Sequence, residues 1–239
     1  MQGIILTGGQ GSRLRPLTDN TNKHLLDICG WPMIHYSLSI FVSAGVRDIT
    51  LVSNSWHLDK FKEYLGNDYN GRFDSIQFIS QTDEKPGIAG SIQHVPEENR
   101  RGPYMLVLAD NIIGGSVSEF RTRFDQNPDK ALIFLTEVQS PEAFGVAHVE
   151  DGHLLYIEEK PESPDSHCAI TGIYFFPSDL FEIASRVRPS RRGEYEITDV
   201  LAQYLQDDRL EYCYLPFWWI DAGTHDALDL ARRRICEKS

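Results

Sequence analysis

The sequence predicts a single α/β domain in which a Rossmann-like, mixed but mostly parallel sheet carries helices on both faces. Two observations support this: short β-rich apolar runs alternate with amphipathic stretches, and the first run leads directly into a glycine-rich turn. Repeated strand–helix–strand units give parallel strands joined by crossover helices. With 239 residues, 41% of them hydrophobic and 24% charged, the chain can bury a sizeable core. We expect one domain over 1–239.

Four apolar runs in the first half are short and rich in β-branched residues, which is typical of buried strands. They span residues 3–7, 48–53, 75–80 and 103–109. Helices are expected between them. Pro32 opens the first helix and Gly45 ends it, and two more helices are expected over 57–65 and 87–95.

After residue 110 the strands are more closely spaced, and helices follow them. Ser116-Val-Ser-Glu119 has the spacing of a capping box, so a helix is expected to begin at Ser116. Asp151-Gly152 predicts a tight turn between two strands. The expected strands span 132–138, 146–149, 154–159, 169–176 and 210–221, and helices are expected over 178–187, 195–206 and at the C-terminal end.

The first expected strand ends in Gly8-Gly-Gln-Gly-Ser-Arg13, a turn whose backbone N–H groups can converge on phosphate oxygens. A dinucleotide fingerprint needs a third glycine three positions after Gly11, and that position holds Leu14. A Walker loop needs Gly-Lys-Ser/Thr, but Gly11 precedes Ser12 and Arg13. The turn is therefore a phosphate loop of a third kind, with a solvated loop as the alternative.

The charge of the chain argues for a small anionic substrate. The formal net charge is −12, which is unfavourable for non-specific binding to nucleic acid. Between residues 10 and 24, however, Arg13, Arg15 and Lys23 face only Asp19. We infer a basic pocket on an acidic body, and no apolar run of membrane-spanning length occurs.

The four cysteines, at positions 29, 168, 213 and 236, show no Cys-x-x-Cys motif and no pairing pattern. We therefore expect neither a disulfide framework nor a zinc site. Because the chain also lacks a secretory leader pattern, we expect a cytoplasmic protein.

Two aspartates are candidate metal ligands. Asp110 follows the strand expected over 103–109, and Asp221 follows an aromatic pair. Ligands of open α/β sheets bind at the carboxyl ends of strands, and Mg²⁺ prefers carboxylate and phosphate oxygens. Each aspartate could instead form a turn or cap a helix.

Two cations could bind anions elsewhere. Lys160 ends a strand in Glu158-Glu-Lys-Pro161, and Arg192 lies in a loop before a helix. Either could equally be a solvated surface charge. The histidines have no metal-ligand spacing, and the chain offers no covalent nucleophile with an evident partner.

Longer stretches resemble the sugar-1-phosphate nucleotidyltransferases, and within that family most of all the short glucose-1-phosphate thymidylyltransferases. The resemblance runs from about residue 2 to 235. Its most specific parts are Arg192-Gly-Glu-Tyr-Glu-Ile-Thr-Asp199 and Trp219-Ile-Asp-Ala-Gly-Thr-His225. The other matching stretches are Gly3 to Leu14, Asn22-Lys-His-Leu-Leu26, Pro32-Met-Ile34, Leu108-Ala-Asp-Asn111, Phe144-Gly-Val146, Glu158-Glu-Lys-Pro161 and Thr171-Gly-Ile-Tyr174.

The resemblance implies that a sugar-1-phosphate oxygen attacks the α-phosphorus of a nucleoside triphosphate in line, with pyrophosphate leaving. It assigns dTTP and α-D-glucose 1-phosphate as substrates and dTDP-glucose, a deoxysugar or rhamnose precursor, as product. By the same resemblance, Arg13 would hold the triphosphate, Lys23 would bridge the two reacting phosphates and Lys160 would hold the sugar phosphate. Asp110 and Asp221 would hold Mg²⁺.

The resemblance also implies binding residues, with Gln81 reading the pyrimidine and Glu159 contacting sugar hydroxyls. It divides the domain into a nucleotide-binding half, about 1–110, and a sugar-phosphate-binding half, about 111–239. A homo-oligomer, dimeric or tetrameric, is expected. The implied binding residues are Leu6, Gly8, Gly9, Gly11, Ser12, Gln81, Gly87, Gly145, Glu159, Lys160, Thr171 and Arg192.

One departure leaves the choice of base and sugar open, because Gly90 replaces a glutamine common in the family. The alternatives are a uridylyltransferase, or a thymidylyltransferase acting on another sugar 1-phosphate. A further alternative is a non-catalytic subunit that senses sugar nucleotides. Such a subunit should have lost the charged residues that the resemblance places in the site. This chain keeps all five of them: Arg13, Lys23, Asp110, Lys160 and Asp221.

Overall fold

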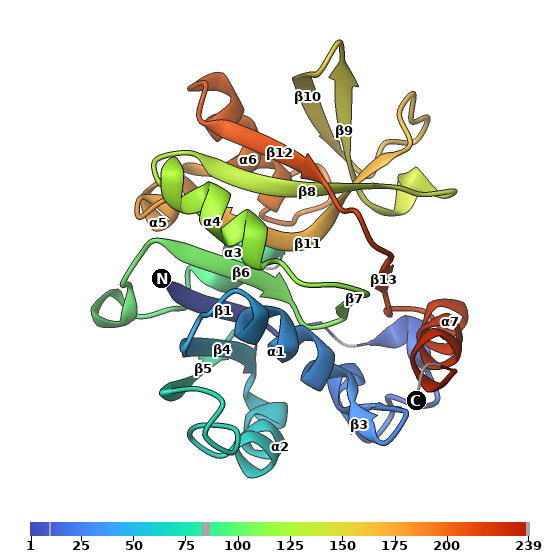
Figure 1. The fold of residues 1–239 in the computed structure, drawn as a ribbon. Helices are drawn as coiled ribbons and strands as arrows, with labels where there is room; N and C mark the ends of the chain where they lie inside the picture. Colours follow the sequence, from blue (N-terminus) through green and yellow to red (C-terminus); the bar gives the residue numbers. More distant parts are fainter. Residues whose placement is uncertain (10, 83–86, 238–239) are drawn as a thin grey trace.

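The computed structural model describes residues 1–9, 11–82 and 87–237, and within them nine strands form a central sheet (Figure 1). Across the sheet they run β10 (His153–Glu159), β9 (Gly145–Glu150), β11 (Cys168–Phe176), β6 (Tyr104–Leu108), β1 (Gln2–Leu6), β4 (Asp48–Asn54) and β5 (Ser75–Gln81). Strand β8 (Ala131–Glu137) pairs with β11, and β12 (Leu210–Tyr214) pairs with β8.

The sheet is parallel in its first half and mixed in its second. Strands β6, β1, β4 and β5 are mutually parallel, whereas β11 runs antiparallel to β6, β8 and β9. The β9–β10 hairpin turns at Asp151-Gly152, as predicted, with both residues at positive φ. Two small sheets join β2 (Asp27–Ile28) to β3 (Trp31–Pro32) and β7 (Asn111–Ile113) to β13 (Trp219–Asp221).

Helices cover both faces of the sheet, as predicted. One buried cluster lies beneath α1 (Met33–Ser43), α2 (Ser55–Leu65) and α4 (Ser118–Gln126). The other lies beneath α3 (Ile88–Ile92), α5 (Leu180–Arg186) and α6 (Ile197–Gln206). The remaining helices are α7 (His225–Cys236) and the 3₁₀ turns Ser12–Leu14, Lys23–Leu25, Glu97–Asn99 and Pro141–Ala143.

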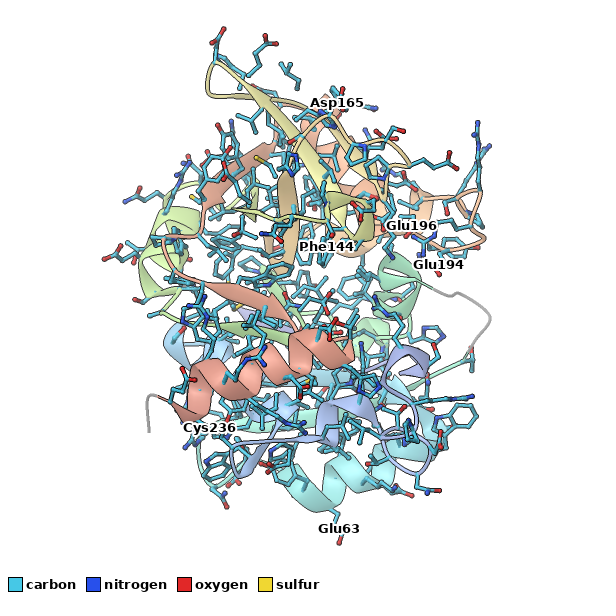
Figure 2. The ribbon with its side chains drawn as sticks, turned by 90° about the vertical axis from the view of Figure 1, so that its right-hand side faces the viewer. Glu63, Phe144, Asp165, Glu194, Glu196 and Cys236 are labelled. Atoms are coloured by element: carbon cyan, nitrogen blue, oxygen red, sulfur yellow. A yellow bond between two sulfur atoms is a disulfide. The ribbon has the colours of Figure 1, made fainter. Side chains whose placement is uncertain are left out.

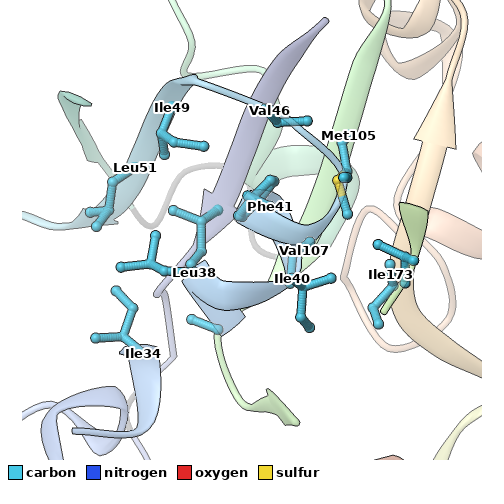
Figure 3. Close-up of a cluster of buried hydrophobic side chains, with 14 of the residues drawn as sticks. Ile34, Leu38, Ile40, Phe41, Val46, Ile49, Leu51, Met105, Val107 and Ile173 are labelled. Atoms are coloured by element: carbon cyan, nitrogen blue, oxygen red, sulfur yellow. The ribbon is translucent and has the colours of Figure 1, made fainter. Parts of the chain in front are cut away.

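Helix α1 shows how the pattern becomes packing. Its apolar side chains recur at helical spacing, and Ile34, Leu38 and Phe41 are almost completely buried. Figure 3 shows them beside side chains of β4 and β6, Leu51 and Met105 among them. The helix ends at Ser43, two residues before Gly45, which was predicted to end it and has a positive φ.

A third, smaller core lies beside the carboxyl ends of the strands. It packs Leu14 and Ile28 from the N-terminal loops against Ile112, Ile220 and α7, which lies beside β13 in Figure 1. This core fixes the segments that carry the candidate site.

Three predictions are corrected. Cys29 and Cys236 form a disulfide between the β2–β3 turn and the end of α7, although the spacing of the cysteines shows no pairing pattern. Helix α4 begins at Ser118 with Val117 as N-cap, and the Ser116 hydroxyl accepts only the Ser118 N–H, at 3.2 Å. The strand expected over 210–221 is two strands, β12 and β13, in different sheets.

Among the described residues, no helix could span a membrane.

Candidate active site

A cleft of about 500 Å³ opens at the carboxyl ends of β1, β4, β5 and β6, where an open α/β sheet binds its ligands. It continues into a smaller cavity of about 110 Å³, and both are lined by Ile88, Leu108, Glu159 and Lys160. Of the predicted residues, the cleft is lined by Leu6, Gly8, Gly9, Lys23, Gln81, Gly87 and Asp110 as well, and the small cavity by Arg13, Gly145 and Asp221.

Four predicted charged residues meet where this cleft joins the small cavity. The Lys23 ammonium donates a hydrogen bond to Oδ2 of Asp110. A side-chain carbon placed on Gly223 would lie 2.8 Å from Oδ1 of Asp221, 3.1 Å from Nη2 of Arg13 and 3.7 Å from Oδ2 of Asp110. The predicted ligands and cations, up to 208 residues apart in sequence, therefore surround one point.

Pairing of β7 with β13 brings the two aspartates together. In this pair Asn111 faces Asp221, and the backbone N–H of Ala222 donates to the Asp110 carbonyl at 2.9 Å. The Asn111 side chain ties the corner further: its Nδ2 donates to Asp110 at 3.1 Å, and its Oδ1 accepts from Trp219 Nε1 at 2.6 Å.

The two carboxylates are electrostatically different. Burial, and then repulsion by Asp110, raises the pKa of Asp221 to about 6. Burial also acts to raise the pKa of Asp110, but the adjacent Lys23 outweighs it and holds that pKa well below its ordinary range. Burial lowers the pKa of Lys23, but the charge of Asp110, the hydrogen bond to it and the charge of Asp221 together outweigh burial and leave the pKa raised. Lys23 and Arg13 together therefore offset the buried Asp110 and the half-buried Asp221 only in part, because the pKa of Asp221 stays raised, and a further cation would stabilise the corner.

The glycine-rich turn positions Arg13 and Lys23. Gly11 has φ +61°, and a side chain there would meet Thr18 at 3.0 Å and the Lys23 Cβ at 3.3 Å. The chain can therefore close tightly before the 3₁₀ turn that carries Arg13. Gly11 and the exposed Ser12 shape this turn but do not line the cleft as Gly8 and Gly9 do.

A second charged group lies on the opposite side, where β10 ends. Glu159 accepts a hydrogen bond from Thr198 at 3.1 Å and another from Arg192 at 3.3 Å. The Lys160 ammonium is 3.7 Å from the same carboxylate. Arg192 contacts Glu159 without lining the cleft, and it also pairs with Glu196. Figure 2 places Glu196 with Phe144 in the upper half of the molecule, above α7.

Thr171, a predicted binding residue, lies behind the cavity walls. It is fully buried and does not line either cavity, and its hydroxyl has no hydrogen-bond partner among the described residues.

Sequence reasoning missed several residues of the site. Asn54 and Thr198 line it, and Asn111 holds its corner. Asn111 follows Asp110 directly and could have been found from that position. His24 lines the cleft as a neutral ring, because burial and then the charge of Lys23 lower its pKa to about 3.

Asp110 and Asp221 are the residues predicted to hold a metal ion. Within the described part of the chain, no group of three or more His, Cys, Asp or Glu side chains is placed to bind a metal together. Two carboxylates, as here, are the protein contribution that Mg²⁺ commonly takes when substrate phosphates supply other ligands.

Comparison with known proteins agrees with this geometry. A family model for nucleotidyl transferases matches residues 2–238. Glucose-1-phosphate thymidylyltransferase of Neisseria meningitidis is 38% identical over 232 residues, covering 95% of this chain and 80% of that protein. The Mycobacterium tuberculosis enzyme of the same name is 37% identical, with the same coverage.

Solved structures show the same fold. A Bacillus anthracis protein assigned as a glucose-1-phosphate thymidylyltransferase, in complex with sucrose, matches with a TM-score of 0.91 and 36% identity, over 98% of this chain and 94% of that one. A UDP-glucose pyrophosphorylase has a TM-score of 0.87 at 21% identity, a likeness of fold. The chain therefore belongs to the nucleotidyl transferase family, and it is a sugar-1-phosphate nucleotidyltransferase.

Proposed function

We propose that the chain transfers the thymidylyl group of dTTP to α-D-glucose 1-phosphate, giving dTDP-glucose and pyrophosphate. The observation that carries the proposal is the meeting of Arg13, Lys23, Asp110 and Asp221 where the cleft joins the small cavity. Two anionic substrates repel each other, so a catalyst for this reaction must mainly position them and neutralise their charge.

The cations divide this task by position. Arg13 follows the glycine-rich turn and would hold the triphosphate and the departing pyrophosphate. Lys23, buried beside Asp110, would exchange this partner for the α-phosphate as the nucleotide enters. Lys160, which follows β10 and lines both the cleft and the small cavity, would hold the sugar phosphate. Each of the three cations is carried by a different segment, and the fold sets the distances between them. The phosphates that they bind would therefore be aligned with one another by the fold.

The carboxylate pair fits Mg²⁺. Repulsion between Asp110 and Asp221 contributes to a pKa of about 6 for Asp221, and a divalent cation between the side chains would relieve it. Mg²⁺ bound there would offset charge on the α-phosphate, a contribution on the order of several kcal/mol. The aspartates would hold the ion, and Asn111 would keep Asp110 oriented through its 3.1 Å hydrogen bond.

Base and sugar are assigned to opposite parts of the cleft. Gln81 ends β5 at the cleft wall, and its amide can pair with N3–H and O4 of thymine or uracil. Glu159 and Gly145 line the part assigned to the sugar. Because uracil presents the same N3–H and O4 as thymine, UTP is the competing donor.

An activity grid tests the proposal. Pyrophosphate release is measured with dTTP, UTP and dCTP, each against several sugar 1-phosphates, with and without Mg²⁺. We expect the highest kcat/KM for dTTP with glucose 1-phosphate, and dependence on the cation. Strong preference for UTP would overturn the thymidylyl assignment, and strong preference for another sugar phosphate would overturn the glucose assignment.

A further inference from the structure

Asn54 occupies a helix-capping position without capping the helix. It is the N-cap of α2, and asparagine there ordinarily accepts a hydrogen bond from a backbone N–H of the first turn. Its side chain makes no such bond. Instead, Oδ1 accepts from Nε2 of Gln81 at 2.9 Å. Asn54 is 7% exposed and lines the cleft. Its side chain therefore makes a hydrogen bond to Gln81 within the site in place of the hydrogen bond that would cap α2.

The contact leaves Gln81 with one defined orientation. Its Nε2 is held by Asn54, and its buried Oε1 has no hydrogen-bond partner among the described residues. Gly8 packs against the same amide: a side-chain carbon on Gly8 would lie 2.7 Å from Nε2 and 3.1 Å from Oε1. A buried acceptor without a partner is unfavourable unless a ligand supplies a donor. We therefore expect Oε1 of Gln81 to accept a hydrogen bond from an N–H group of the ligand.

We propose that Asn54 is a positioning residue that fixes the amide of Gln81 and so decides which pyrimidine the cleft accepts. The proposal rests on the proposed function, in which Gln81 contacts the base. With Nε2 tied to Asn54, Gln81 offers Oε1 as acceptor and its second N–H as donor. Thymine and uracil match this order, because N3–H donates and O4 accepts.

Cytosine presents the opposite order, with an unprotonated N3 and an amino group at position 4. It would be matched only if the Gln81 amide rotated by about 180°, an inexpensive rotation for a free glutamine side chain. Rotation here would turn Oε1 toward Oδ1 of Asn54, so two acceptors would face each other unless the Asn54 amide rotated as well. Asn54 thereby disfavours cytosine without touching it, because both amides would have to turn together.

Two substitutions separate this role from a structural one. Asn54→Asp keeps an acceptor at the same reach. Asn54→Ser keeps a good N-cap for α2 but is too short to reach Gln81. The quantity compared is the ratio of kcat/KM for dTTP to that for dCTP, with glucose 1-phosphate, because the new negative charge of Asn54→Asp repels the triphosphate groups of both donors alike.

We expect Asn54→Asp to keep this ratio within about threefold of the wild type, and Asn54→Ser to lower it by about tenfold, the equivalent of one hydrogen bond. The change should lie in KM, since the base is remote from the reacting phosphates. Equilibrium binding of dTTP and dCTP without sugar phosphate should show the same shift. An unchanged ratio in Asn54→Ser, or parallel losses for both nucleotides, would overturn the proposal.

Gln81→Leu distinguishes failure of this proposal from failure of the proposed function. If it lowers the dTTP preference and Asn54→Ser does not, the role of Asn54 is wrong while base reading by Gln81 stands. If Gln81→Leu leaves the preference unchanged in an active enzyme, Gln81 does not read the base and both assignments fall. A wild-type protein that turns over neither dTTP nor UTP would refute the proposed function itself.

Discussion

Replacing Asp221 by asparagine should make the metal-free protein more stable at neutral pH and much less active. Asparagine has almost the same shape as aspartate, and its Oδ1 can keep the 2.9 Å hydrogen bond from the Gly223 N–H. The substitution removes the negative charge that Asp110 repels. We expect this combination of higher stability and lower turnover if the Asp221 carboxylate is needed for activity but destabilises the folded protein.

The magnitude follows from proton linkage. Burial and Asp110 raise the pKa of Asp221 from 3.8 to about 6, a difference of about 2 units, and each unit is worth about 1.36 kcal/mol. The folded state then keeps a proton between pH 3.8 and 6 that the unfolded state loses, so stability falls as pH rises through this window. Above pH 6 the full penalty applies, at most about 3 kcal/mol because the carboxylate keeps some solvent contact.

Urea unfolding in EDTA tests this calculation. At pH 7.5 we expect Asp221→Asn to increase the free energy of unfolding by about 1–3 kcal/mol, with the gain shrinking as pH falls toward 4. Asp151→Asn is the matched control, because it removes an exposed carboxylate from a turn that asparagine also favours. Equal destabilisation of Asp221→Asn at both pH values would refute the reasoning.

Three further outcomes are expected. Asp110→Asn should lower turnover at least ~100-fold with folding nearly intact, measured by initial rates and thermal melting; wild-type rates would remove Asp110 from the site. Lys160→Ala should raise KM for the sugar phosphate and leave that for dTTP almost unchanged, and equal effects on both would contradict its position. Cys29→Ser should lower stability by at most about 5 kcal/mol, because the bond to Cys236 spans 207 residues; identical urea midpoints for oxidised wild type and variant would show that the disulfide contributes nothing.

Elements with long, regular patterns were predictable because burial alone decides them. Helix α1 and strand β4 have the expected type and nearly the expected bounds. The start of α4 was not predictable, although Ser116 and Glu119 have capping-box spacing. The N–H of Val117 is taken by the Ser43 hydroxyl at 3.2 Å, a contact from α1 that no local pattern reveals.

The site was predictable residue by residue but not as an arrangement. Asp110 could be chosen because it follows an apolar strand and Asp221 because it follows an aromatic pair, and a resemblance supplied their partnership. Their proximity depends on β7 and β13, and three residues are too few to show a periodic pattern. Asn54 was missed because its position is that of an ordinary helix cap, which suggests no role in the site. Its contact with Gln81 spans 27 residues, so no local pattern reveals it.

The third core explains how two buried carboxylates can stay together. Repulsion between Asp110 and Asp221 favours separation of β7 from β13, and Lys23 and Arg13 compensate for only part of it. Ile112 and Ile220 of these strands are buried against Leu228 of α7, so apolar packing opposes the separation. The disulfide fastens the far end of α7 to the β2–β3 turn, a few residues after Lys23. The charged corner is therefore stabilised from behind, by groups that line neither the cleft nor the small cavity, and cleavage of the disulfide should loosen α7 before it disturbs the central sheet.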